Sequence, residues 1–93
     1  MKNEIIDRFQ EKFKEFDYDV THEAVLRFSL VVDGGVFTNK ELAKKLQDHL
    51  NESGVKIKLS HAYEVLSRVC GYKSWNVASG IGANLQSELK RRA

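Results

Sequence analysis

Apolar residues recur at steps of three and four over the first part of the chain, with charged residues between them. The apolar stripe consists of Ile5, Ile6, Phe9, Phe13 and Phe16. This spacing is typical of one face of an amphipathic α-helix. We therefore expect a first helix over residues 3–16, which ends at the polar run that begins with Asp17.

A second apolar run follows Thr21, whose hydroxyl can accept a hydrogen bond from a free backbone amide of the next turn. Its members are Ala24, Val25, Phe28, Val31 and Val32. Because these residues cover most of a helix circumference, the pattern favours a central, buried helix. The alternative for residues 28–32 is a strand of a hairpin that turns at Asp33-Gly34-Gly35.

The third helix has a well-specified start. Thr38 is followed three positions later by Glu41, the spacing of a capping box in which each side chain accepts a hydrogen bond from the other residue's backbone amide. The helix should begin at Asn39, and Gly54 should end it, because glycine tolerates the left-handed conformation. Its expected buried residues are Leu42, Ala43, Leu46 and Leu50.

Apolar and basic residues alternate after this helix. Val55, Ile57 and Leu59 are separated by Lys56 and Lys58, the period of a half-buried strand or of an extended connector. No partner strand is evident in the sequence. The pattern therefore predicts a short extended segment or a minor β element.

Two further helices are expected, each beginning after a serine cap. Ser60 would cap the fourth helix, which Gly71 ends, and Ser74 would cap the last. The fourth helix would bury Ala62, Val65, Leu66 and Val69, and the last would bury Ala78, Ile81, Leu85 and Leu89. Gly80 and Gly82 weaken the last helix, which suggests close approach of a neighbour.

Together these elements predict an all-α, mainly helical protein, with five helices in a single domain over residues 1–93. A chain of 93 residues with no proline and no low-complexity stretch offers no domain boundary. No apolar run approaches the roughly 20 residues of a membrane span, so we expect a soluble, cytoplasmic protein without a membrane partner. The lone Cys70 agrees with a reducing compartment.

Residues 43–78 resemble a small helical domain of bacterial glyoxalase-superfamily-related proteins. The resemblance rests on Ala43-Lys44-Lys45-Leu46, on Leu59-Ser60-His61, and on Gly71-Tyr72-Lys73-Ser74-Trp75-Asn76. It implies a helical module. It implies no glyoxalase chemistry, because that reaction needs several His and Glu metal ligands on β-rich modules, which this chain lacks. The chain departs from the family pattern by two extra residues within Val55 to Lys58 and by a long N-terminal extension.

The motif residues also have an architectural interpretation as a corner between two helices. Ser60 and Ser74 would satisfy free helix amides, Gly71 would reverse the chain, and Tyr72 would fold back on the fourth helix. Trp75 is expected to fill the angle between the helices rather than to bind a partner. We expect His61 to form a hydrogen bond across the corner, whereas Asn76 could serve the loop or a partner equally well.

Catalytic and metal-binding constellations are not evident. His22, His49, His61 and Cys70 lack the paired spacing of zinc ligands. Nine positions along one helix separate His61 from Cys70 by about 13 Å, too far for a nucleophile and its base. We therefore expect no enzyme activity, no cofactor and no metal, and we expect Cys70 to be a packing residue.

The charge distribution suggests a binding function. Residues 1–37 hold five basic and eight acidic residues, whereas residues 38–93 hold ten and five, for a net charge of +2. The first hypothesis is a noncatalytic binding module of bacterial, plasmid or phage origin that contacts nucleic acid through Lys56, Lys58, Arg68, Lys73 and Asn76. Helices over residues 38–50 and 60–69 resemble a helix-turn-helix with an overlong turn, in which Tyr63, Glu64, Ser67 and Arg68 would face outward.

The alternative hypothesis is a small protein-interaction regulator or inhibitor. It would dock a larger assembly through the acidic first helix or through the corner around Tyr72 and Trp75. Whether the first helix belongs to the core or closes a dimer is open at this stage, and so is the oligomeric state.

Overall fold

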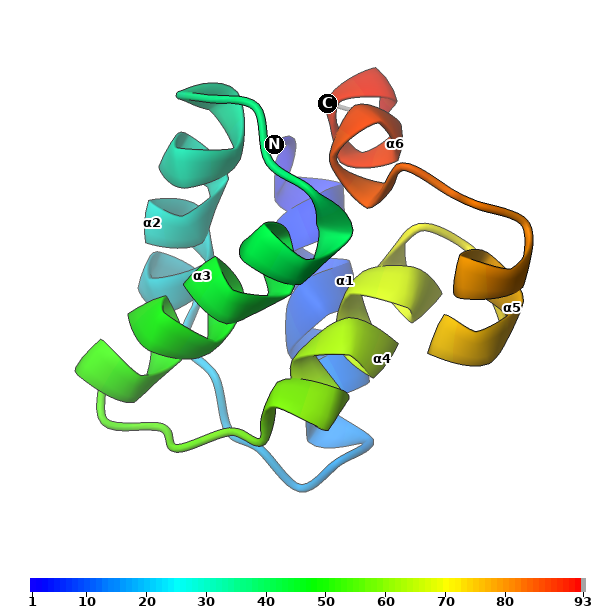
Figure 1. Cartoon of the computed structure of the whole chain (residues 1–93). Helices are drawn as coiled ribbons and strands as arrows, with labels where there is room; N and C mark the ends of the chain where they lie inside the picture. Colours follow the sequence, from blue (N-terminus) through cyan, green and yellow to red (C-terminus); the bar gives the residue numbers. More distant parts are fainter. Residues whose placement is uncertain (93) are drawn as a thin grey trace.

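Six helices and their connections make up the fold in a computed structural model that describes residues 1–92 (Figure 1). Their bounds are α1 Asn3–Lys14, α2 His22–Asp33, α3 Asn39–Glu52, α4 Leu59–Val69, α5 Trp75–Gly80 and α6 Leu85–Arg91. The described part of the chain contains no strand. The expected all-α fold is confirmed, with one more helix than the five predicted.

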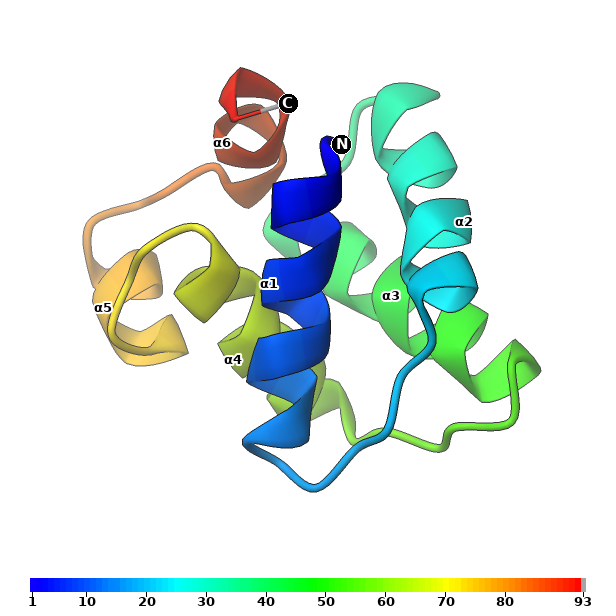
Figure 2. The same ribbon diagram turned by 180° about the vertical axis from the view of Figure 1, so that it is seen from behind.

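Helix α4 lies at the centre of the arrangement. It packs against α1, α3 and α5, while α2 packs against α1, α3 and α6 (Figures 1 and 2). The helical conformation expected for the run from Ala24 to Val32 is confirmed, and the hairpin alternative for residues 28–32 is excluded. The expectation that this helix is central and buried is wrong, because one face of α2 is exposed. Leu26 and Leu30 of α2 are 42% and 68% exposed, so the apolar residues of this helix extend beyond its buried face.

The hydrophobic core joins all six helices. The largest fully buried side chains are Phe9, Phe13, Phe28, Ile6, Leu42, Leu46, Leu50, Leu66, Leu85, Leu89, Val25 and Val32. Phe9 stacks on Phe13 and meets Phe28 edge to face, at ring-centroid distances of 6.5 Å and 5.8 Å. Helix α1 is thus part of the core, which answers the question that the sequence left open.

Side-chain caps begin α2 and α3 as their sequences predict. The Thr21 hydroxyl accepts a hydrogen bond from the Ala24 amide at 3.1 Å. Both arms of the Thr38–Glu41 capping box are present, each at 3.1 Å. Gly54 follows α3 with a φ of +90°, the left-handed conformation expected of the residue that ends this helix.

Residues 55–58 form an extended connector without strand pairing among the described residues. Side chains of α3 form hydrogen bonds with the backbone of this connector, in the place of a partner strand. Gln47 Nε2 donates to the Ile57 carbonyl at 3.0 Å, and the Ile57 amide donates to Asn51 Oδ1 at 3.2 Å. The predicted extended segment is confirmed up to Lys58, whereas Leu59 already belongs to α4.

The predicted last helix is two helices, α5 and α6. Gly82 has a φ of +69°, which an α-helix cannot accommodate, and the Asn84 side chain caps α6 by accepting from the Ser87 amide at 3.0 Å. Ile81 is 66% exposed, so its predicted burial is wrong. A Cβ added at Gly80 or Gly82 would meet no atom within 4 Å. The second glycine therefore permits a turn rather than the close approach that we expected.

Helix α1 runs from one end of the molecule to the other. Its first turn lies at the same end as α6, and the Met1 amino group is 3.9 Å from the Asp33 carboxylate (Figures 1 and 2). The connection of residues 15–21 lies at the opposite end, where Asp17 has a φ of 63°. None of the described helices is long and apolar enough to cross a membrane.

Candidate functional site

The turn between α4 and α5 forms the corner that the motif predicts. Gly71 has a φ of +93°, and the Tyr72 amide donates back to the Ser67 carbonyl at 2.9 Å, the 6→1 bond of a glycine-ended helix. Ser74 accepts from the Val77 amide at 3.2 Å and so caps α5. The predicted roles of Gly71 and Ser74 as chain reversal and helix cap are confirmed.

A hollow that is open to solvent lies between the N-terminal half of α4 and the start of α5. Its volume is about 580 Å³, and we call it the corner groove. The lining residues are Leu59, Ser60, His61, Tyr63, Glu64 and Trp75. Four of its six residues, Leu59, Ser60, His61 and Trp75, carry the sequence motif.

The aromatic wall of the corner groove consists of Tyr63 and Trp75. Their ring centroids are 4.5 Å apart with an angle of 33° between the planes, and both side chains are half-buried against the core. Trp75 therefore packs in the angle between the helices, as expected, and also borders the open hollow. The backbone amide of Trp75 donates to Glu64 Oε1 at 3.1 Å, so the first turn of α5 is fixed to α4.

His61 is held by the connection between α1 and α2. Its ring stacks on Phe16 with centroids 4.5 Å apart, and its Nδ1 lies 2.8 Å from the hydroxyl of Tyr18. The Lys58 amide donates to the same hydroxyl at 3.3 Å. The expected hydrogen bond of His61 is present, but its partner comes from the α1–α2 connection rather than from the corner.

Ser60 is not the cap of α4. Lys58 occupies the capping position without a side-chain hydrogen bond, and its carbonyl accepts from the amides of His61 and Ala62, both at 3.1 Å. The helix begins at Leu59 because this apolar residue packs against the core within the first turn. Ser60 is the one exposed residue of α4.

The five basic or amide residues expected to contact nucleic acid differ in their exposure and in whether their charge is already paired. Lys56 and Lys58 are exposed before α4, and Lys73 and Asn76 are exposed around the start of α5. Arg68 is only 33% exposed and is already neutralised. Its guanidinium lies 3.3 Å from Glu15 Oε1, its Nε is 3.8 Å from Glu64 Oε2, and it lies 4.8 Å from the centre of the Phe16 ring.

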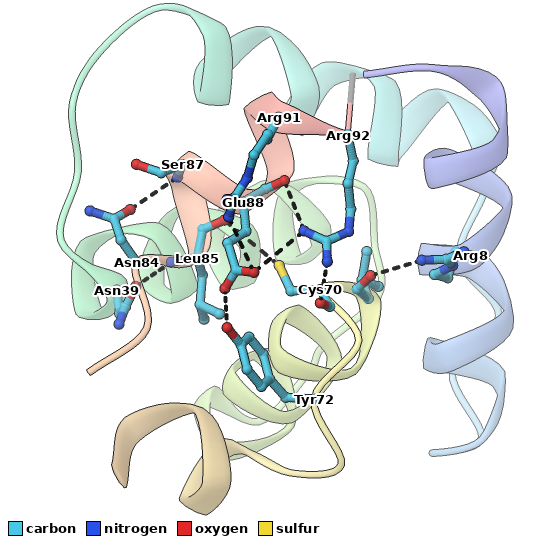
Figure 3. A network of polar contacts seen from close by, with 11 residues as sticks. Arg8, Asn39, Cys70, Tyr72, Asn84, Leu85, Ser87, Glu88, Arg91 and Arg92 are labelled. Atoms are coloured by element: carbon cyan, nitrogen blue, oxygen red, sulfur yellow. Dashed lines mark hydrogen bonds and ion pairs between the residues drawn. The ribbon is translucent and has the colours of Figure 1, made fainter. Parts of the chain in front are cut away.

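Tyr72 belongs to a polar network with α6 rather than to the corner groove (Figure 3). Its hydroxyl donates to Glu88 Oε2 at 2.5 Å, and this hydrogen bond is the main cause that raises the pKa of Tyr72. Glu88 also pairs with Arg91 and Arg92, each at 3.5 Å, and Arg92 donates to the Cys70 carbonyl at 2.8 Å. Arg92 and Glu88 therefore hold α6 against the end of α4, whereas the pair of Arg91 with Glu88 lies within α6.

Cys70 is buried, and burial raises the pKa of its thiol to about 12. At neutral pH the thiol is protonated and inaccessible, so the interpretation of Cys70 as a packing residue is supported. Within residues 1–92, no group of three or more His, Cys, Asp or Glu residues is placed to hold a metal ion.

The helix-turn-helix comparison does not extend to the packing of α4. Three helices surround α4, and Ser67, expected to face outward, is buried with its hydroxyl on the Tyr63 carbonyl at 2.8 Å. Tyr63, Glu64 and Arg68 are each only half-buried. A recognition helix needs a face free to enter the major groove, whereas Ser60 is the one exposed residue of α4.

The family model of a glyoxalase superfamily protein matches residues 32–92, about two thirds of the chain. The chain belongs to the glyoxalase superfamily protein family. The matched region contains α3 to α6 and the whole corner groove, and it includes residues 43–78, on which the sequence resemblance rests. No curated protein and no solved structure matches the chain.

The match to the glyoxalase superfamily protein family separates the site into two parts. Every residue that lines the corner groove lies inside the matched region, whereas Phe16 and Tyr18, which hold His61, lie outside it. Neither residue is predicted from the sequence to be part of the site. They are more than 40 positions from His61 and the motif does not include them, so no local pattern could have revealed the contact.

Proposed function

We propose that this member of the glyoxalase superfamily protein family is a noncatalytic binding module whose corner groove takes up an apolar side chain of an acidic segment in a partner protein. The observation that carries the proposal is the solvent-open groove walled by Tyr63 and Trp75. Tryptophan and tyrosine in partly enclosed hollows are the side chains most often found at binding hot spots.

The charge around the corner groove favours an acidic segment. Residues 55–76 contain the basic residues Lys56, Lys58, Arg68 and Lys73 and a single acidic residue, Glu64. Glu64 is bound to the Trp75 amide and paired with Arg68, so the exposed lysines determine the charge that a partner meets. Complementary charge at the rim of an interface speeds association and selects among partners.

A protein segment fits the groove better than a nucleic acid does. Arg68 is the arginine of the candidate set, and its charge is already taken by Glu15 and Glu64. Phosphate contacts depend on free cations, so this arginine adds little to them. Exposed Lys56, Lys58, Lys73 and Asn76 keep nucleic acid as the competing outcome of the test.

Two groups that could serve as a nucleophile or a base are engaged elsewhere. The Cys70 thiol is buried with a pKa of about 12, which leaves it protonated at neutral pH. Nδ1 of His61 is occupied by the Tyr18 hydroxyl. Both placements support a binding function rather than catalysis.

The test compares capture of a partner by the protein and by two matched serine variants. Ser60→Tyr fills the corner groove from the exposed turn of α4, whereas Ser79→Tyr adds the same ring to an exposed serine of α5 that does not line the groove. Host lysate, with and without nuclease treatment, is passed over each immobilised protein, and the retained protein is then purified. We expect capture by the wild-type protein and by Ser79→Tyr, and loss of capture by Ser60→Tyr.

Affinity measurements with the purified partner complete the experiment. Trp75→Phe should weaken binding about 10-fold or more, since hot-spot aromatics contribute roughly 2 kcal/mol or more. Capture that requires nucleic acid, with an affinity that falls steeply with salt, would replace the protein partner by a nucleic acid. Equal binding by the Ser60→Tyr and Ser79→Tyr variants would exclude the corner groove.

A further inference from the structure

The Tyr18 hydroxyl joins the connection between α1 and α2 to His61. The Tyr18 oxygen accepts a hydrogen bond from the Lys58 amide at 3.3 Å, and it lies 2.8 Å from the Nδ1 atom of His61. A neutral imidazole that accepts at Nδ1 carries its hydrogen at Nε2. A tyrosine that donates to Nδ1 thereby favours the tautomer with the hydrogen at Nε2.

The ring of His61 is also fixed in orientation. Phe16 stacks on one side with an angle of 29° between the planes, and Tyr18 meets the ring at 62° with centroids 5.5 Å apart. Phe16 is itself covered by the guanidinium of Arg68, whose charge is balanced by Glu15 and Glu64. The imidazole therefore has a fixed ring plane, and His61 lines the corner groove.

We propose that His61 is the hydrogen-bond donor of the corner groove and offers Nε2–H to a carboxylate of the bound segment. This inference rests on the proposed function, because it assigns the polar contact next to the apolar anchor that Tyr63 and Trp75 receive. Among the other lining side chains, Glu64 accepts hydrogen bonds and Ser60 is an exposed hydroxyl, while the Tyr63 hydroxyl and the Trp75 indole N–H are further donors on the aromatic wall that receives the apolar anchor. A carboxylate also fits the lysine beside the groove, Lys58.

The positioning residues of this donor lie outside the region that matches the family. Phe16 and Tyr18 belong to the N-terminal extension, whereas His61 and the groove belong to residues 32–92. The extension therefore does more than cover the core with α1. It sets the hydrogen-bonding pattern of the groove and with it the chemistry of the segment that binds.

Two small probes test the donor without knowledge of the natural partner. Phenylacetate presents an aromatic ring with a carboxylate, and its methyl ester presents the same ring without the charge. Each is titrated against the ¹⁵N-labelled protein, and the signals of the Trp75 indole and of the His61 ring nitrogens are followed by NMR. We expect both probes to shift the indole signal, and phenylacetate to bind about 10-fold tighter than the ester, as a hydrogen bond to a charged group requires.

The variants separate this inference from the proposed function. His61→Phe keeps a ring for Phe16 to stack on but has no donor, so most of the preference for phenylacetate should disappear, leaving the part due to Lys58, while ring binding at Trp75 persists. Tyr18→Phe leaves the fold intact and should reduce the preference partly, with both tautomers of His61 visible in the ring-nitrogen signals. His49→Phe, at a half-buried histidine outside the groove, serves as the control and should keep the full preference.

Two results would overturn the donor role while the groove remains a binding site. One is equal binding of the two probes to the wild-type protein, and the other is a wild-type His61 whose hydrogen resides on Nδ1. Failure of both probes to shift the Trp75 indole would instead refute the corner groove itself, and the proposed function with it.

Discussion

Replacing Gln86 with alanine removes a buried amide that holds the connection between α2 and α3. Gln86 is 5% exposed. Its Nε2 donates to the carbonyls of Val32 and Gly35 at 2.8 Å and 2.7 Å, and its Oε1 accepts from the Phe37 amide at 2.7 Å. One side chain of α6 thus satisfies three backbone groups more than 45 positions away in the sequence.

The cost of the Gln86→Ala substitution follows from what becomes of those three groups. A buried polar group left without a partner costs about 1–3 kcal/mol. The Val32 carbonyl is the buried member, whereas water can reach the partly buried groups of Gly35 and Phe37 once the side chain is gone. We expect a loss of about 2–4 kcal/mol in the free energy of unfolding. At about 2.1 cal/mol/K of unfolding entropy per residue, a chain of 93 residues loses roughly 5 °C of Tm per kcal/mol, or about 10–20 °C.

Urea denaturation followed by circular dichroism measures the loss, and thermal unfolding gives the shift in Tm. Gln47→Ala is the matched control, because Gln47 also donates its amide to a distant carbonyl, that of Ile57, but makes only this one long-range contact. It should cost about 1 kcal/mol. If the two variants lose the same stability, the three contacts of Gln86 do not act as a clamp and the argument is wrong.

The remaining predictions concern the thiol, the capping box and two glycines. Burial raises the pKa of Cys70 from 9.0 to about 12, so the thiol ionises at a lower pH in the unfolded chain than in the folded protein. The stability that Cys70 contributes is therefore present below pH 9 and is lost as the pH rises from 9 towards 12. Cys70→Ala should flatten this decline in alkaline urea titrations, and a thiol reagent should label the native protein only as fast as it unfolds. The hydrogen bond from the Thr38 backbone amide, and then that with the Thr38 side chain, lower the pKa of Glu41 below 4.5. The contribution of the Glu41 carboxylate to the stability of the fold is therefore present above pH 4.5 and lost on acidification. Glu41→Gln should weaken the acid dependence of Tm, whereas Thr38→Ala should cost about 1 kcal/mol of unfolding free energy at neutral pH. Gly82→Ala should destabilise the fold by about 1 kcal/mol or more, because the φ of Gly82 is +69°. Gly80→Ala should stabilise the fold by about 0.4–1 kcal/mol, because the new Cβ would meet no atom within 4 Å. The opposite order of Tm in thermal melts of the two variants would contradict the turn assigned to Gly82.

Local signals predicted most of the helix starts and ends. Thr21, Thr38 with Glu41, and Ser74 cap helices because the residues that satisfy free amides lie within three positions of them. Gly54 and Gly71 end helices because their conformation is left-handed. These features depend on the nearest neighbours in the chain, which a sequence displays directly.

The wrong predictions of helix bounds arose where a local sequence pattern did not reveal that a helix begins or ends. Ile81, Leu85 and Leu89 keep helical spacing, so the apolar pattern continued through Gly82, although the paired glycines and Asn84 carried the signal of a turn and a new cap. Ser60 was predicted to cap α4 because serine is a frequent cap residue. The helix instead begins at Leu59, one position before Ser60, and Leu59 packs against the core. Trp75 and His61 were recognised as motif residues, whereas their meeting in an open groove depends on the tertiary positions of α5 and of the α1–α2 connection.

The arrangement of the chain ends has a practical consequence for attaching this protein to something else. Met1 and the end of α6 lie at one end of the molecule, and the connection that supports His61 lies at the other (Figures 1 and 2). A fluorescent label, a carrier domain or a sensor surface joined through either terminus would therefore stand apart from Phe16 and Tyr18. Tethering the protein in this way leaves the aromatic hollow facing the solution, where a partner can reach it.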